Sequence, residues 1–275
     1  MARAQWALGI ACTLVVAQGL LGCTSVPSSV PVITRPVVLF GEVHDNAAQH
    51  ALRLQAFEAL LRSGARPALL LEQFDRERQP AIDRARAGTP AADAAQIILA
   101  GSGAPASDSR SWNWPFYQPL IALALAYELP IVAANVSRDD ARRVISDGLG
   151  ATGFDPLVAP EIQRVQSEAI EGSHCGMLDA AQAQRMAGAQ VARDQFMARL
   201  VEAHAQRGVV LLAGNGHVRT DVGVPRWLTP ATRAKTESIG MLEADDSGHA
   251  ENEGAFDRVL LTPRQTRKDP CATTP

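Results

Sequence analysis

Lysine and aromatic residues are scarce in this chain of 275 residues, and its charges nearly balance. Lysine occurs only at Lys235 and Lys268, aromatic residues make up 5% of the sequence, and the formal net charge is −3. Proteins that bind nucleic acids usually carry basic clusters together with aromatic rings for base stacking, and this sequence has no such combination. We therefore expect no nucleic-acid partner. The shortage of lysine beside many arginines and alanines indicates coding bias.

A glycine-rich phosphate loop is also missing. The nearest candidate is Gly214-Asn215-Gly216, which lacks the third glycine and the ribose-binding acid of a dinucleotide-binding fold. The hydrophobic fraction of 47% still predicts a packed core. A chain of this length suits one large α/β domain, or such a domain with a small accessory lobe.

The first hydrophobic run is on the short side for crossing a bilayer. It extends from Trp6 to Leu21, follows the lone basic residue Arg3, and leads through Leu-Leu-Gly to Cys23. This pattern predicts a lipoprotein signal peptide over residues 1–22, with Cys23 as the lipidated first residue of the mature chain. Residues 23–35 then form a flexible tether to a membrane. The alternative is an ordinary cleaved signal peptide followed by an incidental cysteine.

Few cysteines remain after this processing. Cys12 leaves with the signal peptide and Cys23 is acylated, so that Cys175 and Cys271 are left. These two can pair in an oxidising periplasm. Alternatively, Cys271 is unpaired and mobile in a polar tail, residues 263–275, which we expect to be disordered. Both readings stay open at the level of the sequence.

Short apolar runs bounded by polar residues, glycine and proline predict an α/β fold over residues 36–262, with a mostly parallel sheet flanked by helices. Between the first two runs, apolar residues recur at the spacing of a helix. This indicates a strand–helix–strand unit, which implies a crossover between parallel strands. Residues of about 75–115 and 153–195 show mainly helical patterns, so we assign them to a smaller helical lobe. The predicted strands cover residues 36–40, 68–71, 130–134, 209–213, 238–243 and 256–261.

One motif, Gly-x-x-His, occurs twice, and each copy directly follows a predicted strand. The first copy contains Glu42 and ends at His44, and the second ends at His217. Other strands deliver Glu72 and, just beyond Asn135, Arg138. Because open α/β sheets bind ligands outside the carboxyl ends of their strands, we expect these side chains to share one site. The candidate catalytic residues are Glu42, His44, Glu72, Arg138 and His217.

The same cluster contains potential metal ligands. Carboxylates and imidazoles together suit zinc, manganese or iron, and a further carboxylate can act as a general base toward a bound water molecule. The alternative is a structural role, in which the histidines satisfy buried carbonyls and Glu72 pairs with Arg138. The candidate ligands of a divalent metal ion are Glu42, His44, Glu72 and His217.

A second cluster consists of His174, Met177 and, elsewhere in the sequence, Tyr117. Imidazole, thioether and phenol groups can all bind iron in proteins, so these three residues are candidate cofactor ligands. The alternative for residues 174–177 is a small turn between two helices. The aromatic segment from Trp112 to Tyr117 can stack on a planar ligand, or it can fill the gap between lobe and sheet.

At these residues the sequence resembles the ChaN-like haem-binding lipoproteins of bacteria, which are related to the wider Tiki and TraB group. The resemblance covers about residues 37–261. It implies a parallel-sheet α/β domain with a helical lobe, haem as cofactor, and a lipid anchor in the outer membrane facing the periplasm. The matching segments are Leu-Phe-Gly-Glu-Val-His-Asp-Asn with His50 following, Leu-Glu-Gln-Phe, Asn-Val-Ser-Arg, His-Cys-Gly-Met and Gly-Asn-Gly-His.

Two functional hypotheses follow. The first is a lipid-anchored protein that binds haem for iron uptake, with an outer-membrane haem receptor as a partner. A flat ligand exposed at the lobe can be covered by a second copy of the chain, so a homodimer is compatible with this hypothesis. The second hypothesis is a metal-dependent, peptidase-like hydrolase, because the resemblance to the Tiki and TraB group assigns metal chemistry to the paired motifs.

Overall fold

The computed structural model describes residues 29–100, 112–245, 250, 252–269 and 271–272. The expected signal peptide, its cleavage region and Cys23 lie outside the described residues. Among the helices of the described part, none combines the length and the apolar character needed to span a bilayer.

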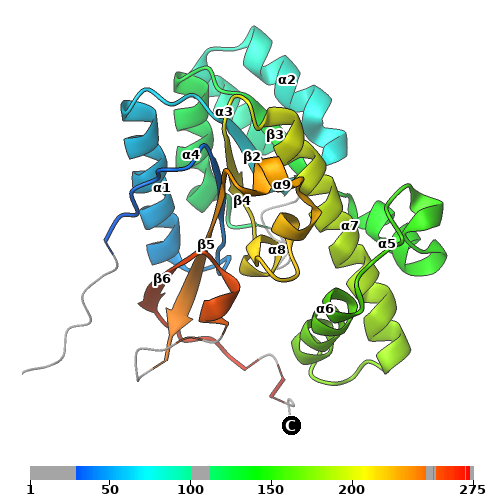
Figure 1. Cartoon of the computed structure of the whole chain (residues 1–275). Coiled ribbons are helices and arrows are strands. Elements are labelled where there is room, and N and C mark those ends of the chain that lie inside the picture. Colours follow the sequence, from blue (N-terminus) through cyan, green and yellow to red (C-terminus); the bar gives the residue numbers. More distant parts are fainter. Residues whose placement is uncertain (1–28, 101–111, 246–249, 251, 270, 273–275) are drawn as a thin grey trace, which may run out of the picture.

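The described residues form one six-stranded sheet in which every pair of neighbouring strands is parallel. Its order is β3-β2-β4-β1-β5-β6 (Figure 1), which confirms the predicted α/β fold with a parallel sheet. The strands are β1 (Val37–Phe40), β2 (Ala68–Asp75), β3 (Ile131–Asn135), β4 (Val209–Leu212), β5 (Thr236–Ala244) and β6 (Arg258–Pro263).

The strands that precede the two Gly-x-x-His motifs, β1 and β4, are direct neighbours. Their register pairs Phe40 with Leu212, so both strands end at the same level of the sheet. The chain leaves β1 toward β2 on one side and leaves β4 toward β5 on the other. Such a divergence opens a crevice at the carboxyl edge of a parallel sheet.

Helices cover both faces of the sheet. They are α1 (Ala47–Arg62), α2 (Gln79–Gly88), α3 (Ala91–Ala100), α4 (Trp114–Ala126), α5 (Arg138–Asp147), α6 (Pro160–Ser173), α7 (Ala180–His204), α8 (Asn215–Val218) and α9 (Pro230–Arg233), with short 3-10 turns η1 (Arg76–Arg78), η2 (Gly150–Thr152), η3 (Val224–Trp227) and η4 (Glu253–Ala255).

Alternate residues of the strands face two separate cores, as the pleat requires. Val38 and Phe40 of β1 pack toward α1–α4, whereas Val37 and Leu39 pack toward α7 and the segment around α8 and η3. Figure 1 shows α1 and α4 on one side of the sheet and α7 on the other. Because every strand of the centre is buried on both faces, its sequence is a continuous apolar run.

The two segments assigned to a helical lobe lie in different places. In the second segment, α6 packs on α7 beside the sheet, and α5, which precedes this segment, packs there as well (Figure 1). The small cores at this place include Val144 of α5 and Ile162 of α6. Residues 75–100 instead contribute Ile82, Ala94 and Ile98 to the main core under the sheet. Their small apolar residues allow α2 and α3 to lie close to the other helices of that face.

The outer edge of β3 is covered by a side chain. The amide of Gln79, the first residue of α2, donates to the carbonyl of Ile131 at 3.0 Å and accepts from the backbone N–H of Ala133 at 2.7 Å. This side chain therefore takes the place of a neighbouring strand at one end of the sheet.

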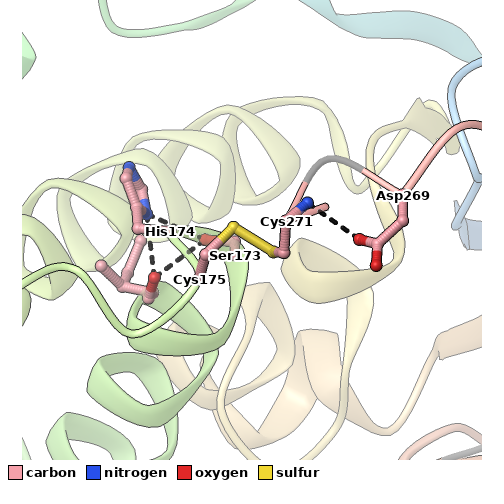
Figure 2. The surroundings of a disulfide bond; sticks show 6 residues. Ser173, His174, Cys175, Asp269 and Cys271 are labelled. Carbon is pink, nitrogen blue, oxygen red and sulfur yellow. Dashed lines mark hydrogen bonds between the residues drawn. A yellow bond between two sulfur atoms is a disulfide. The ribbon is translucent and has the colours of Figure 1, made fainter. Parts of the chain in front are cut away.

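The described part of the C-terminal tail is attached to the domain at two points, although we expected residues 263–275 to be disordered. Arg267 forms ion pairs with Asp45 and with Glu243, each at 2.6 Å. Cys271 forms a disulfide with Cys175 in the turn between α6 and α7 (Figure 2). The two cysteines left open by the sequence are therefore paired.

Candidate functional site

A cleft of about 650 Å³ lies at the carboxyl edge of the sheet, at the crevice between β1 and β4. Both Gly-x-x-His motifs contribute to it, and helices α6 and α7 form another part of its wall. The lining residues are Glu42, Val43, His44, Glu72, Trp112, Asn135, Gln166, Ala169, Ile170, Ser173, Gln190, Arg193, Gly214, Asn215, Gly216 and His217.

Glu42 is the buried anchor of the first motif, with an exposed fraction of 2%. One carboxylate oxygen forms an ion pair with Arg53 of α1, and the other accepts hydrogen bonds from Tyr117 and from His44. Burial opposes ionisation of Glu42, but the Arg53 charge together with the hydrogen bond from His44 and the charges of His44 and His50 outweighs this effect, so the pKa of Glu42 lies below its ordinary value. Glu42 is therefore a fixed carboxylate that orients His44.

His44 is held through one nitrogen of its ring. Its Nδ1 lies 2.6 Å from Glu42, and because the carboxylate can only accept, His44 donates this proton. Its side chain remains 49% exposed. Partial burial lowers the pKa of His44, but the hydrogen bond with Glu42 and the charge of Glu72 raise it above its ordinary value. The Nε2 atom has no hydrogen-bond partner among the described residues.

His50 supports this loop from α1. Its Nε2 donates to the carbonyl of His44 at 3.0 Å, and its Nδ1 accepts from Arg53 at 2.5 Å. Burial and the nearby Arg53 charge lower the pKa of His50 to about 4, so the ring is neutral at physiological pH. His50 therefore has a structural role, since both of its nitrogens are used within the protein.

The second motif places His217 between two carboxylates. Its Nδ1 lies 2.6 Å from Asp194 of α7, and its Nε2 lies 3.4 Å from Glu72 of β2. Burial disfavours the charged ring, but the two carboxylates raise the pKa of His217 to about 10. At Glu72 burial raises the pKa, but the charge and hydrogen bond of His217, with the His44 charge and the Gly214 N–H, together lower it to about 2. Burial raises the pKa of Asp194 to about 6. His217 is therefore an imidazolium that holds β2, α7 and the second motif together.

Two glycines of the motifs allow the loops to approach each other closely. A Cβ atom at Gly41 would lie 2.2 Å from the side-chain oxygen of Asn215. A Cβ atom at Gly214 would lie 3.1 Å from Cε1 and 3.3 Å from Nε2 of His44. The amide N–H of Gly214 also donates to Glu72 at 2.7 Å. Because glycine has no side chain, the two motifs can approach each other at Gly41, and the His44 ring has space beside Gly214.

Asn215 fixes the second motif to β5, which lies on the other side of β1. Its side-chain amide donates to the carbonyl of Met241 in β5 at 2.6 Å and accepts from the Met241 N–H at 3.0 Å. Its own backbone N–H donates to the carbonyl of Glu42 at 3.1 Å. The Asn215 side chain therefore continues the hydrogen bonding of β5 beyond the point where β1, the neighbour of β5, has ended, and it is not a free ligand donor.

The structure brings together four of the five candidate catalytic residues, because Glu42, His44, Glu72 and His217 all line the cleft. Arg138 does not line it. Arg138 is the exposed first residue of α5, and it directly follows Ser137, the N-cap residue of this helix. An arginine of α7, Arg193, lines the cleft instead.

The candidate haem ligands lie outside the cleft or behind its wall. Tyr117 is fully buried, and its hydroxyl donates to Glu42, so its oxygen is not presented to a ligand. His174 follows Ser173 at the end of α6, where its Nδ1 lies 2.9 Å from the carbonyl of Ile170. Met177 is 79% exposed in the turn that carries the disulfide. Tyr117 therefore supports Glu42, and the other two belong to the α6–α7 turn.

Sequence reasoning missed three charged residues that matter to the cleft: Arg53, Arg193 and Asp194. A signal existed for two of them. In α1 the buried positions include Gln49, Arg53 and Phe57, and in α7 they include Val191, Asp194 and Ala198. A single charged residue on the buried face of a helix needs a buried partner of opposite charge, so such a residue in the sequence indicates a nearby polar site.

The predicted metal ligands share the cleft, but their donor atoms already serve other partners. Glu42 is used by Arg53 and Tyr117, Glu72 by Gly214 and His217, and His217 by two carboxylates. Within the described part of the chain, no group of three or more His, Cys, Asp or Glu side chains is placed to hold a metal ion. A free imidazole nitrogen on His44 suits a cofactor that needs one protein ligand.

The fold and the cleft define a parallel α/β protein with a cleft at the carboxyl edge of its sheet, which is the candidate site. The family model described as "Haem-binding uptake, Tiki superfamily, ChaN" matches residues 32–228, and the chain belongs to this family of haem-binding proteins. This confirms the resemblance read from the motifs. No curated protein matches the sequence.

Two solved structures are similar to this chain over most of its length. ChaN of Campylobacter jejuni, described with cofacial haem binding, is similar with a TM-score of 0.62 and 20% identity, over 79% of this chain and 86% of that chain. A mutant of the erythromycin esterase EreC in its open conformation has a TM-score of 0.46 and 15% identity, over 76% of this chain and 70% of that chain. At such identity, the likeness to the first structure shows a common fold.

Proposed function

We propose that this protein binds haem in the cleft between β1 and β4, and that His44 would hold the iron. The observation that carries the proposal is the state of the His44 ring. A buried carboxylate, Glu42, fixes Nδ1 and leaves Nε2 without a partner among the described residues. Histidines that bind metals usually donate their second ring N–H to a carboxylate or carbonyl in this way, which fixes the tautomer.

The other residues of the cleft are compatible with a flat aromatic cofactor. Its volume of about 650 Å³ falls in the range of cofactor sites. The Trp112 ring stands edge-on to the His44 ring, with 4.5 Å between centroids, and offers an apolar surface. When bound, haem supplies an iron centre that accepts a nitrogen ligand. The role of the chain is to bind and orient it, with Gly214 leaving space beside His44.

A hemin titration of the protein, followed by the Soret absorbance, tests this proposal. We expect saturable binding by the wild type and at least about a tenfold loss of affinity in His44→Ala, because an iron–nitrogen bond is lost. His204→Ala is a matched control, since His204 lies near the end of α7 and does not line the cleft.

Three further variants separate the alternatives. If His174 or Met177 holds the iron, His174→Ala or Met177→Ala will weaken binding while His44→Ala will not. Tyr117→Phe removes only a hydrogen bond to Glu42, so we expect a smaller effect on hemin affinity than from His44→Ala. Absence of saturable binding by the wild type would contradict the proposed function as a whole.

We also propose that the protein is a lipoprotein of the outer membrane that faces the periplasm and serves haem and iron uptake. The lipobox-like segment before Cys23 and the family support this role. Partners of this kind of protein would be a haem receptor in the same membrane and a second copy of the chain. Incorporation of labelled fatty acid should disappear in Cys23→Ala, and persistent label in that variant would contradict the anchor.

A further inference from the structure

Arg193 is the cleft cation that the protein leaves without a carboxylate partner in the described part of the chain. It is partly buried on α7, and its guanidinium lies 3.3 Å from the side-chain oxygen of Gln190, one helical turn earlier. The other strong cations of this region are paired, Arg53 with Glu42 and His217 with Glu72 and Asp194. Arg193 therefore differs from its neighbours in having only a neutral contact.

A partly buried guanidinium with a neutral partner is electrostatically incomplete. Arginine carries its charge at every relevant pH, and removing it from water costs free energy that an anion can offset. Asp75 and Asp194 feel the Arg193 charge, since it lowers the pKa of both carboxyls against the larger effect of burial, but neither forms an ion pair with it. The missing partner can come from a ligand of the cleft.

We propose that Arg193, assisted by Gln190, binds a carboxylate of the ligand in the cleft. The planar guanidinium binds carboxylates through two parallel hydrogen bonds, and a neighbouring amide can donate a third. This inference rests on the proposed function and deepens it, because haem carries two propionate carboxylates beside its apolar ring. Arg193 then fixes the orientation of haem in the cleft, whereas His44 holds its iron.

A comparison of two ligands with one variant tests this role. Hemin carries free propionates, and hemin dimethyl ester has the same ring and iron but no carboxylate charge. We expect Arg193→Gln to weaken hemin binding by roughly tenfold or more, as is typical when charge-assisted hydrogen bonds are lost. The same variant should leave the affinity for the dimethyl ester unchanged. Arg193→Lys should fall between, since an ammonium group cannot form the paired contact.

Arg185→Gln provides the matched control, because Arg185 lies on the same helix, is exposed, and does not line the cleft. It should bind both ligands like the wild type. Equal losses for both ligands in Arg193→Gln, or no loss for hemin, would overturn the assignment of Arg193 while leaving haem binding intact. Failure of the wild type to bind hemin would overturn the proposed function and this inference together.

Discussion

Individual side chains determine the geometry of the cleft, and Glu42 contacts three of them: Arg53, Tyr117 and His44. It lies at the end of a central strand, receives Arg53 and Tyr117 from two helices, and positions His44. Of these partners only His44 is close to Glu42 in the sequence, whereas Arg53 and Tyr117 come from α1 and α4. The carboxylate is stable in the interior because one oxygen is paired with the Arg53 charge and the other accepts hydrogen bonds.

Replacement of Arg53 by methionine should therefore be costly. Methionine fills a similar volume but leaves the Glu42 charge buried without its counterion, and breaking a buried pair in this way typically costs about 3–5 kcal/mol. Urea unfolding at pH 7 measures the loss. The exposed pair of Arg62 with Glu58 on the same helix gives a control, because Arg62→Met should cost at most about 1 kcal/mol.

The double variant Arg53→Met with Glu42→Gln makes this prediction specific. If the loss arises from the unpaired charge, neutralising Glu42 as well should recover part of the stability. If the double variant is no more stable than Arg53→Met, the stability comes from the packing of the Arg53 side chain and not from its charge.

At the scale of elements, the sequence patterns predicted where the strands begin and end better than they predicted how the strands are ordered. Apolar runs predicted the buried strands, and Gly-x-x-His after two of them predicted that His44 and His217 approach one edge. The pattern did not reveal that β4 inserts between β1 and β2, since strand order depends on packing across the whole sheet. For the same reason the sequence predicted Arg138 as a site residue and did not indicate Arg193, because the direction in which α5 leaves the sheet does not follow from the spacing of its residues.

The disulfide belongs to this scale because it connects two elements that are far apart in the chain. Cys175 in the α6–α7 turn and Cys271 in the tail are 96 residues apart. Ser173, two residues before Cys175, lines the cleft, and Arg267 of the tail pairs with Asp45 next to His44. The bond thus ties the α6 side of the cleft to a tail that is attached beside the first motif.

Removal of this bond should lower stability by about 2–4 kcal/mol, because closing a long loop restricts the unfolded chain. The double variant Cys175→Ser with Cys271→Ser can be compared with the wild type by urea unfolding without reductant. With reductant present, the two proteins should become similar. Equal stability without reductant would show that the bond is absent or does not constrain the unfolded chain.

At the scale of the whole molecule, buried histidines couple folding to pH. The pKa of His50 is about 4 in the folded protein and near 6.5 when the ring is exposed to solvent. Between these values the unfolded chain binds the proton and the folded chain does not. The contribution of His50 to stability is therefore complete above about pH 6.5 and is lost as the pH falls toward 4.

Urea unfolding between pH 4.5 and pH 7.5 checks this prediction. We expect the wild type to lose on the order of 2–3 kcal/mol more than His50→Gln over this range, since glutamine keeps a donor and an acceptor but does not titrate. The comparison of the two proteins removes the contributions of His217, Glu72 and Asp194, which they share. Parallel pH profiles would contradict the assignment of a neutral buried His50.

Gln79 has a consequence for how copies of this protein can meet. The free backbone groups of an outer strand can pair with a strand of another chain. In β3, two hydrogen bonds from the Gln79 side chain already use the carbonyl of Ile131 and the N–H of Ala133. Copies joined at β3 would first have to displace this side chain.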